Sequence, residues 1–184
     1  CKRPMRTHAL KEGDYVVLAL LIWLNVYIRT LPMRINSTGK PGLWDISTNS
    51  WTLGPDLDPF LFLRYAKEII ANGFLAAVDN MRFVPLGFNT SEETQLLPHL
   101  IAWTYKFVGM FKSISVEYAA IILPVIASVF MVVFFFLLVR KIFEEKGKTY
   151  SNVAGLLATL ILVVLPTLLP RTIAGIPEKE SLGF

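Results

Sequence analysis

The sequence predicts an all-α membrane protein, and three observations indicate this class. Hydrophobic residues make up 54% of the 184 residues and charged residues only 17%, whereas a soluble domain carries about 25% charged residues. The mean hydropathy is +0.53. Three apolar stretches approach the roughly 20 residues that a helix needs to cross a hydrocarbon core about 30 Å thick. We therefore expect a chain built around membrane-spanning helices.

The three expected spans are residues 15–33, 116–139 and 152–169. The first contains "YVVLALLIWLNVYI" and then Arg29, which we expect to snorkel to the membrane boundary. Pro124 lies inside the second, and a lipid-buried helix tolerates it. Pro166 and Pro170 predict that the outer end of the third span is broken.

The basic residues predict an orientation. Lysines and arginines lie before the first span, within residues 2–11, and between the second and third spans, within residues 140–148. The positive-inside rule places both groups in the cytoplasm. Residues 34–115 then form a long external loop, residues 170–184 begin a second one, and the protein is a multi-pass protein of the cell membrane.

The external loop is expected to carry amphipathic helices. Pro59 suits the first position of a helix, and Gly73 suits the residue just past its end. The apolar residues that would share one face are Phe62, Ala66, Ile69 and Ile70. Residues 96–111 form a hydrophobic but short stretch with aromatic and basic side chains, so we expect a second helix that lies along the outer interface.

Two pairs of carboxylates stand at the membrane edge. Asp56 and Asp58 precede the first expected amphipathic helix, and Glu178 and Glu180 follow the third span. The predicted orientation places both pairs on the same side. Carboxylate oxygens suit hard divalent cations such as Mg²⁺ or Mn²⁺, which are the ions needed for a reaction on a phosphate leaving group. The pattern predicts a shared metal site.

Each pair also has a plain structural interpretation. Asp58 is placed to cap the helix by accepting backbone N–H bonds. Glu178 and Glu180 are flanked by turn residues and could belong to a solvated loop. Taken one at a time, these interpretations are favoured; taken together, the two pairs favour the metal site.

Four segments resemble, in this order, the N-terminal part of the catalytic subunit of oligosaccharyltransferase: "DPFLFLRYAKEIIANG", "DNMRFVPLG", "LPHLIAWTYKFVG" and "RTIAGIPEKESLGF". In that family an aspartate–proline pair, with an arginine six residues after the aspartate, precedes a "YPLG"-like segment. An "SRSVAGSYDNE"-like segment follows the next membrane hairpin. The resemblance covers about residues 56–184. It implies a transmembrane domain of the GT-C glycosyltransferase type, of which this chain is an N-terminal fragment.

The resemblance also implies a reaction and its partners. The family transfers a glycan from a lipid-linked oligosaccharide donor, carried on polyprenyl phosphate or pyrophosphate, to asparagine in Asn-x-Ser/Thr sequons of an acceptor protein or peptide. Mn²⁺ or Mg²⁺ is the expected cofactor, and the active face is external, or the membrane is that of the endoplasmic reticulum if the source is eukaryotic. The family's "WWDYG" motif is absent from this sequence, so we expect this piece alone to be inactive.

Site residues follow from matching the motifs. The resemblance implies that Asp58 binds the metal and approaches the acceptor amide. Glu178 stands where the family has aspartate and Glu180 stands at the second acid of that motif, so both are further catalytic and metal-ligand candidates. Candidates for substrate or phosphate contacts are Arg64, Arg171, Asp56 and Asp79.

The two arginines have alternatives as well. Arg64 could pair with Glu68 one helical turn away, and Arg171 could anchor the chain at the membrane interface. For the whole chain, the alternatives are another GT-C transferase such as a protein O-mannosyltransferase, or a non-enzymatic membrane scaffold. Transport is disfavoured because the predicted spans hold no ionisable group at their centres. The basic residues beside apolar stretches fit membrane orientation, so we expect no nucleic-acid partner.

Overall fold

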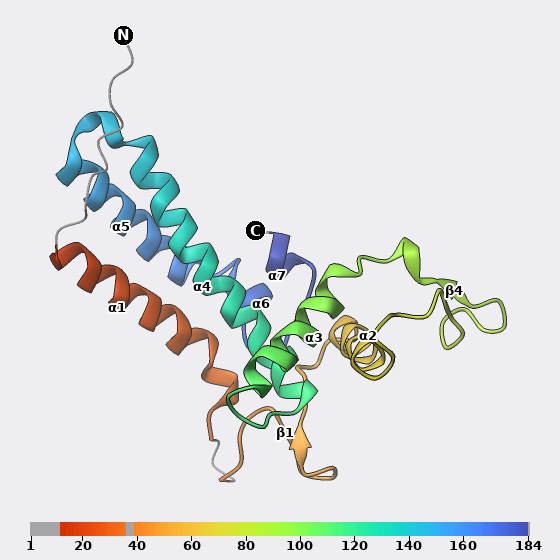
Figure 1. The fold of residues 1–184 in the computed structure, drawn as a ribbon. Helices are drawn as coiled ribbons and strands as arrows, with labels where there is room; N and C mark the ends of the chain where they lie inside the picture. The colour runs from red at the N-terminus through yellow and green to blue at the C-terminus, as the bar shows by residue number, and fades with distance from the viewer. Residues whose placement is uncertain (1–11, 36–38, 184) are drawn as a thin grey trace.

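The structure is a computed structural model that describes residues 12–35 and 39–183. It is mostly helical, which confirms the predicted all-α class. Three long helices run side by side, and two further helices diverge from them near the start of α4 (Figure 1). The bundle consists of α1 (Glu12–Arg29), α4 (Val116–Ile142) and α5 (Lys148–Val164), and the diverging pair of α2 (Asp58–Asn72) and α3 (Leu96–Gly109).

Short elements connect these helices. Five are helical turns: one after α1, one before α3, one before α5 and two after α5. The remaining short elements pair as two small antiparallel ribbons, β1 with β2 and β3 with β4. Their bounds are η1 Leu31–Met33, β1 Trp44–Asp45, β2 Ser50–Trp51, β3 Val78–Asp79, β4 Phe88–Asn89, η2 Thr90–Glu92, η3 Glu144–Lys146, α6 Leu169–Thr172 and α7 Glu180–Gly183. Trp44 pairs with Trp51 in the first ribbon, and Val78 with Asn89 in the second.

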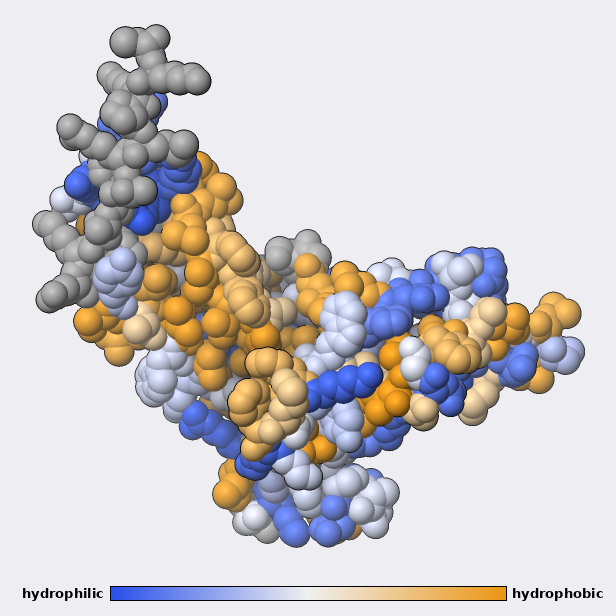
Figure 2. Space-filling view, viewed as in Figure 1, coloured by the Kyte–Doolittle hydropathy of each residue, from blue (hydrophilic) through white to orange (hydrophobic). Residues whose placement is uncertain are grey.

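Apolar residues gather on the surface of the bundle (Figure 2). Among the described residues, α4 is the one helix that is both long and apolar enough to cross a membrane, judged by length and composition. The apolar helix α5 is shorter, at 17 residues. It ends at Val164, two residues before Pro166, which confirms the break predicted there. The first expected span begins earlier than predicted and ends at Arg29, and a 3₁₀ turn replaces its last residues.

Arg29 does not snorkel, so that prediction is wrong. Its side chain is fully buried where α1, α5 and α6 meet. Its Nε donates to the hydroxyl of Thr172 at 2.9 Å and its Nη1 to the carbonyl of Val163 at 3.2 Å. The last carbonyls of a helix lack partners within the helix, and the break at Pro166 leaves Val163 in that position. Arg29 therefore satisfies the broken end of α5 instead of reaching for the membrane surface.

The structure has a helix, α2, where the sequence predicts the first amphipathic helix, and its place in an external loop stays a prediction. Pro59 lies in its first turn, and Gly73 ends it in the left-handed conformation, with its N–H donating to the carbonyl of Ile69. Phe62, Ala66 and Ile69 are buried. Phe62 and Ala66 belong to a core in which α2, α3 and the first turns of α4 pack together. A helix, α3, also forms over the second predicted stretch, and its place at the outer interface stays a prediction.

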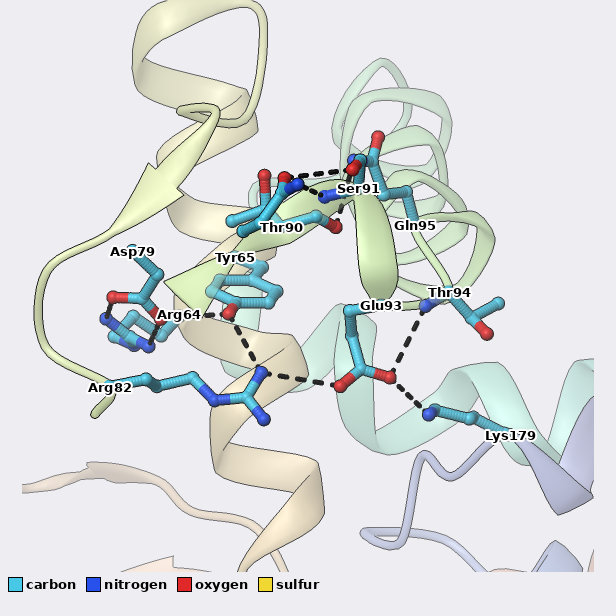
Figure 3. Close-up of polar contacts among 11 residues, drawn as sticks. Arg64, Tyr65, Asp79, Arg82, Thr90, Ser91, Glu93, Thr94, Gln95 and Lys179 are labelled. Carbon is cyan, nitrogen blue, oxygen red and sulfur yellow. Dashed lines mark hydrogen bonds and ion pairs between the residues drawn. The ribbon is translucent and has the colours of Figure 1, made fainter. Parts of the chain in front are cut away.

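The lateral hairpin, residues 74–95, projects away from the bundle beyond α2 and contains β3 and β4 (Figure 1). An ion pair fixes it to α2: both terminal nitrogens of Arg64 donate to the two oxygens of Asp79, and the hydroxyl of Tyr65 donates to the same carboxylate at 2.8 Å (Figure 3). The hydroxyl of Thr90 donates to the carbonyl of Ala76 at 2.6 Å. The hydrogen bonds from Arg64 hold the pKa of Asp79 at about 2.

A backbone joint brings the segment after α5 against the segment before α2. The N–H of Gly54 donates to the carbonyl of Gly175 at 2.8 Å. On the other side, the N–H of Gly175 donates to Ile121 of α4 at 3.1 Å and the N–H of Ala174 to Arg29 at 2.9 Å. Gly175 has φ +93°, and a Cβ there would lie 2.6 Å from a methyl carbon of Leu43. Glycine is therefore required by both conformation and space.

Gly175→Ala should destabilise this joint, because alanine is strained at positive φ by about 1–2 kcal/mol and would also displace Leu43. We expect the midpoint of thermal unfolding, measured in detergent, to fall by a few degrees. Gly109→Ala is the matched control, since a Cβ at the end of α3 meets nothing within 4 Å. Equal effects of the two substitutions would contradict this description of the joint.

Asp79→Asn should abolish a pH-dependent contribution to stability. The folded-state pKa of Asp79, about 2, lies below the ordinary 3.8, so the ion pair stabilises the fold above pH 3.8 and the contribution is lost as the pH falls toward 2. We expect the variant to lose about 2 kcal/mol in free energy of unfolding near pH 6 and to match the parent near pH 2. Unfolding curves at both pH values measure this. The exposed Glu92 of the same hairpin provides the control, Glu92→Gln, and a pH-independent difference for Asp79→Asn would contradict the assignment.

Candidate functional site

The joint places one acid of each pair side by side. Asp56 follows Gly54 by two residues and Glu178 follows Gly175 by three, so the hydrogen bond between the glycines delivers both acids to one place. Their carboxyl groups lie close enough for each to shift the pKa of the other. Glu178 is only 4% exposed, so it does not belong to a solvated loop as its local sequence allowed. The site is therefore assembled by contacts between distant segments.

Arg171 completes this group. Its Nη1 donates to Oε2 of Glu178 at 2.5 Å, and about half of its side chain stays exposed. The pairing raises the pKa of Arg171. The pure interfacial-anchor interpretation of Arg171 is therefore incomplete, because the guanidinium is committed on one side to the acidic site.

The pKa values of the two carboxyl groups shift in opposite directions. Burial raises the pKa of Glu178 and the contact with Asp56 raises it further, against the opposing effect of Arg171. The hydrogen bond with Glu178 lowers the pKa of Asp56, and the N–H of Leu57, 2.7 Å from Oδ1, adds to this. As the pH falls, Glu178 therefore takes up a proton before Asp56 does. Such a pair is a place where a cation can replace a proton.

Asp58 and Glu180 lie two residues further along their segments. Asp58 is the first residue of α2 and is exposed; the helix cap is Leu57, and no side chain makes a capping bond. The interpretation of Asp58 as a helix cap is therefore wrong. Glu180 is the first residue of α7 and is also exposed. Both carboxylates are open to solvent, two residues along the chain from the exposed Asp56 and the buried Glu178.

The expected metal ligands are only partly brought together. Within residues 12–35 and 39–183, no three His, Cys, Asp or Glu side chains are grouped as a ready-made metal site. The predicted set of Asp58, Glu178 and Glu180 is thus not assembled as a cluster, and Asp56, which the sequence offered only as a substrate contact, is the acid that touches Glu178. The donor chemistry still fits a hard divalent cation, because the four groups supply carboxylate oxygens alone.

Arg64 and Asp79 form a pair of their own, away from this contact. Arg64 does not bond to Glu68, which instead accepts the N–H of Ala76 at 2.9 Å. The two terminal nitrogens of Arg64 donate to the two oxygens of Asp79, and a third of the Arg64 side chain is exposed. These contacts give both residues a structural role in the lateral hairpin. A contact to substrate phosphate stays a prediction for each.

Sequence reasoning missed the polar network that continues from this pair (Figure 3). Arg82 donates to the hydroxyl of Tyr65 and to Glu93, both at 3.3 Å. Glu93 in turn accepts from the ammonium group of Lys179. The signal lay in the sequence as a lysine set between two acids, "EKE", but its partner is 86 positions away and no local pattern indicates it.

Comparison with known proteins supports one family. Residues 46–182 match the family described as oligosaccharyl transferase STT3, N-terminal. A dolichyl-phosphooligosaccharide-protein glycotransferase of Methanococcus voltae is 25% identical over 138 residues, which are 68% of this chain and 14% of that protein.

Two solved structures share the fold. The archaeal oligosaccharyltransferase AglB from Archaeoglobus fulgidus, in complex with an inhibitory peptide and a dolichol-phosphate, superposes with a TM-score of 0.71 at 20% identity, over 92% of this chain and 18% of that one. The A. fulgidus oligosaccharyltransferase in complex with zinc and sulfate gives a TM-score of 0.70 at 20% identity, over 90% and 19%.

The present chain thus spans less than a fifth of the length of these relatives. At 20% identity the structural likeness by itself shows the fold alone. The family match is the stronger finding, because it covers well over half of the chain and includes both acidic segments. The chain therefore belongs to the N-terminal STT3 family of oligosaccharyl transferases, as its motifs predict.

Proposed function

We propose that this chain forms part of an oligosaccharyltransferase, which moves a glycan from a polyprenyl phosphate or pyrophosphate carrier to the side-chain amide of asparagine in Asn-x-Ser/Thr sequons. The observation that carries the proposal is the contact between Asp56 and Glu178, made by segments that are distant in sequence. The names of the relatives supply the substrate classes. One is a dolichyl-phosphooligosaccharide-protein glycotransferase, and another was solved with a peptide and a dolichol-phosphate.

The proposed site lies at one end of a membrane-spanning bundle of the GT-C type. Gly175 is bound to Ile121, near the start of α4, whereas the basic connection of residues 140–148 lies at the other end of that helix. If the basic connection faces the cytoplasm, the acidic site faces outward. The segment between α1 and α4 is then the external loop, and α3, with Trp103 and Phe107 exposed, lies at the membrane interface.

Asp56 and Glu178, joined by Asp58 and Glu180, would hold a divalent cation. When bound, the cation would supply neutralisation of the departing phosphate. An all-oxygen donor set favours Mg²⁺ or Mn²⁺. A relative was solved with zinc and sulfate, which supports a metal site in the family fold without fixing the ion used here.

The protein's own groups have separate tasks in this proposal. Asp58, exposed at the start of α2, would accept an N–H of the acceptor amide and so help to weaken the conjugation of the nitrogen lone pair with the carbonyl. Arg171 holds Glu178 with one nitrogen and keeps its exposed side free for a phosphate oxygen. Glu178 is kept in place by Arg171 and by the backbone joint between Gly54 and Gly175.

Removing the key carboxylates should abolish most of the activity. We expect Asp58→Ala and Glu178→Ala, each in the intact enzyme, to lower the rate of glycan transfer to a fluorescent sequon peptide by about 100-fold or more. Glu92→Gln, which removes an exposed carboxylate from the lateral hairpin, should leave the rate unchanged. Thermal unfolding checks that each variant is folded. Full activity in both alanine variants would end the proposed mechanism.

The orientation can be tested separately by cysteine labelling. Cys1 is the single cysteine of this chain and can be replaced by serine. A cysteine introduced at Leu86, which is 88% exposed on the lateral hairpin, should react with a membrane-impermeant maleimide in intact cells. A cysteine at Lys146 in the basic connection should react only after the cells are permeabilised. The reverse pattern would place the acidic site in the cytoplasm and contradict the proposal.

A further inference from the structure

Lys179 presents a problem for any cation site built from its neighbours. It stands between Glu178 and Glu180, so an ammonium group lies within one residue of two proposed ligands. A lysine side chain is long and flexible, and a carboxylate is its natural partner. Left free, Lys179 would pair with these acids and compete with a divalent cation for them.

The structure shows where this ammonium group goes instead. It donates to Oε1 of Glu93, at the end of η2 in the lateral hairpin (Figure 3). It also lies 5.7 Å from the ring centre of Phe62 in α2. Asp56 and Arg171 instead interact with Glu178. Successive side chains of the acidic segment thus take different partners: Glu178 turns to the carboxylate–arginine group, and Lys179 turns to the hairpin.

Glu93 is itself held in position to bind the ammonium group of Lys179. Its side chain is only 14% exposed, and its two oxygens accept from different cations, Oε1 from Lys179 and Oε2 from Arg82. The pairing with Lys179 lowers the pKa of Glu93, so the carboxylate stays charged. Arg82 is itself held by the hydroxyl of Tyr65, which donates to Asp79. The carboxylate of Glu93 is therefore held in position by a hydrogen-bond network that reaches Tyr65 of α2 through Arg82.

We propose that Glu93 is a positioning residue that holds the ammonium group of Lys179 away from Glu178 and Glu180 and so leaves these carboxylates available to a divalent cation. This inference rests on the proposed function, because it requires a cation site at the acidic segments. It adds a residue from a different part of the chain to that site. It also gives the lateral hairpin a role in the site that is separate from any contact with substrate.

The inference differs from a simple tie between loop and hairpin. If the ion pair only tethered the acidic segment, losing either partner would harm the site, and losing both would harm it as much. If Glu93 acts by removing a competing cation, its loss harms the site only while Lys179 is present. The double variant therefore separates the two roles.

The experiment measures Mn²⁺ binding to the intact enzyme in detergent, by the electron paramagnetic resonance signal of free Mn²⁺, for the parent and four variants. Glu93→Gln should weaken binding about tenfold, because a released ammonium group then opposes the ion at close range. Lys179→Gln should bind at least as tightly as the parent. Glu93→Gln combined with Lys179→Gln should return to within about twofold of the parent. Glu92→Gln, the neighbouring exposed carboxylate, is the matched control and should match the parent.

Three results would overturn the inference. Glu93→Gln could bind like the parent, or the double variant could stay as weak as Glu93→Gln, or Lys179→Gln could itself lose tenfold. Thermal unfolding reports whether Glu93→Gln folds. If it does not, the comparison of Lys179→Gln with the parent still tests the inference. A parent enzyme that binds no Mn²⁺ would instead remove the metal site of the proposed function, and the inference with it. That result is distinct from normal binding by the parent with no effect of Glu93.

Discussion

The arrangement of the acidic site depends on one backbone hydrogen bond, from the N–H of Gly54 to the carbonyl of Gly175. Neither glycine has a side chain, so the two segments approach as closely as their backbones allow. The bonds from Gly175 to Ile121 and from Ala174 to Arg29 fix the same segment to the end of the bundle. Charges alone would push Asp56 and Glu178 apart. The joint holds them in contact, and the helices hold the joint.

Arg29 connects the bundle to this arrangement. A buried guanidinium at the end of a long apolar helix is costly unless its donors are used. Here it binds the carbonyl of Val163 and the hydroxyl of Thr172, while its own carbonyl accepts from Ala174. The break of α5 near Pro166 thus supplies one acceptor for the buried side chain of Arg29, whose Nη2 has no hydrogen-bond partner among the described residues. The same break turns the chain toward the acidic segment.

Local features of the fold follow from the sequence, and non-local contacts do not. Pro59 and Gly73 bound α2 as expected, and Pro166 marks the end of α5, because capping and proline geometry act within a few residues. The family motifs indicated both acidic segments and Arg171. The contact of Asp56 with Glu178 and the pairing of Glu93 with Lys179 join positions far apart in the chain, so neither periodicity nor spacing encodes them visibly.

The central claim is that the two acidic segments share one cation. The most direct measurement is an anomalous-scattering map of the intact enzyme crystallised with Mn²⁺. The account predicts a single peak with carboxylate oxygens from both segments, the one around Asp56 and Asp58 and the one around Glu178 and Glu180, within bonding distance of about 2.2 Å. A peak bound by one segment alone, or located elsewhere in the protein, would contradict it.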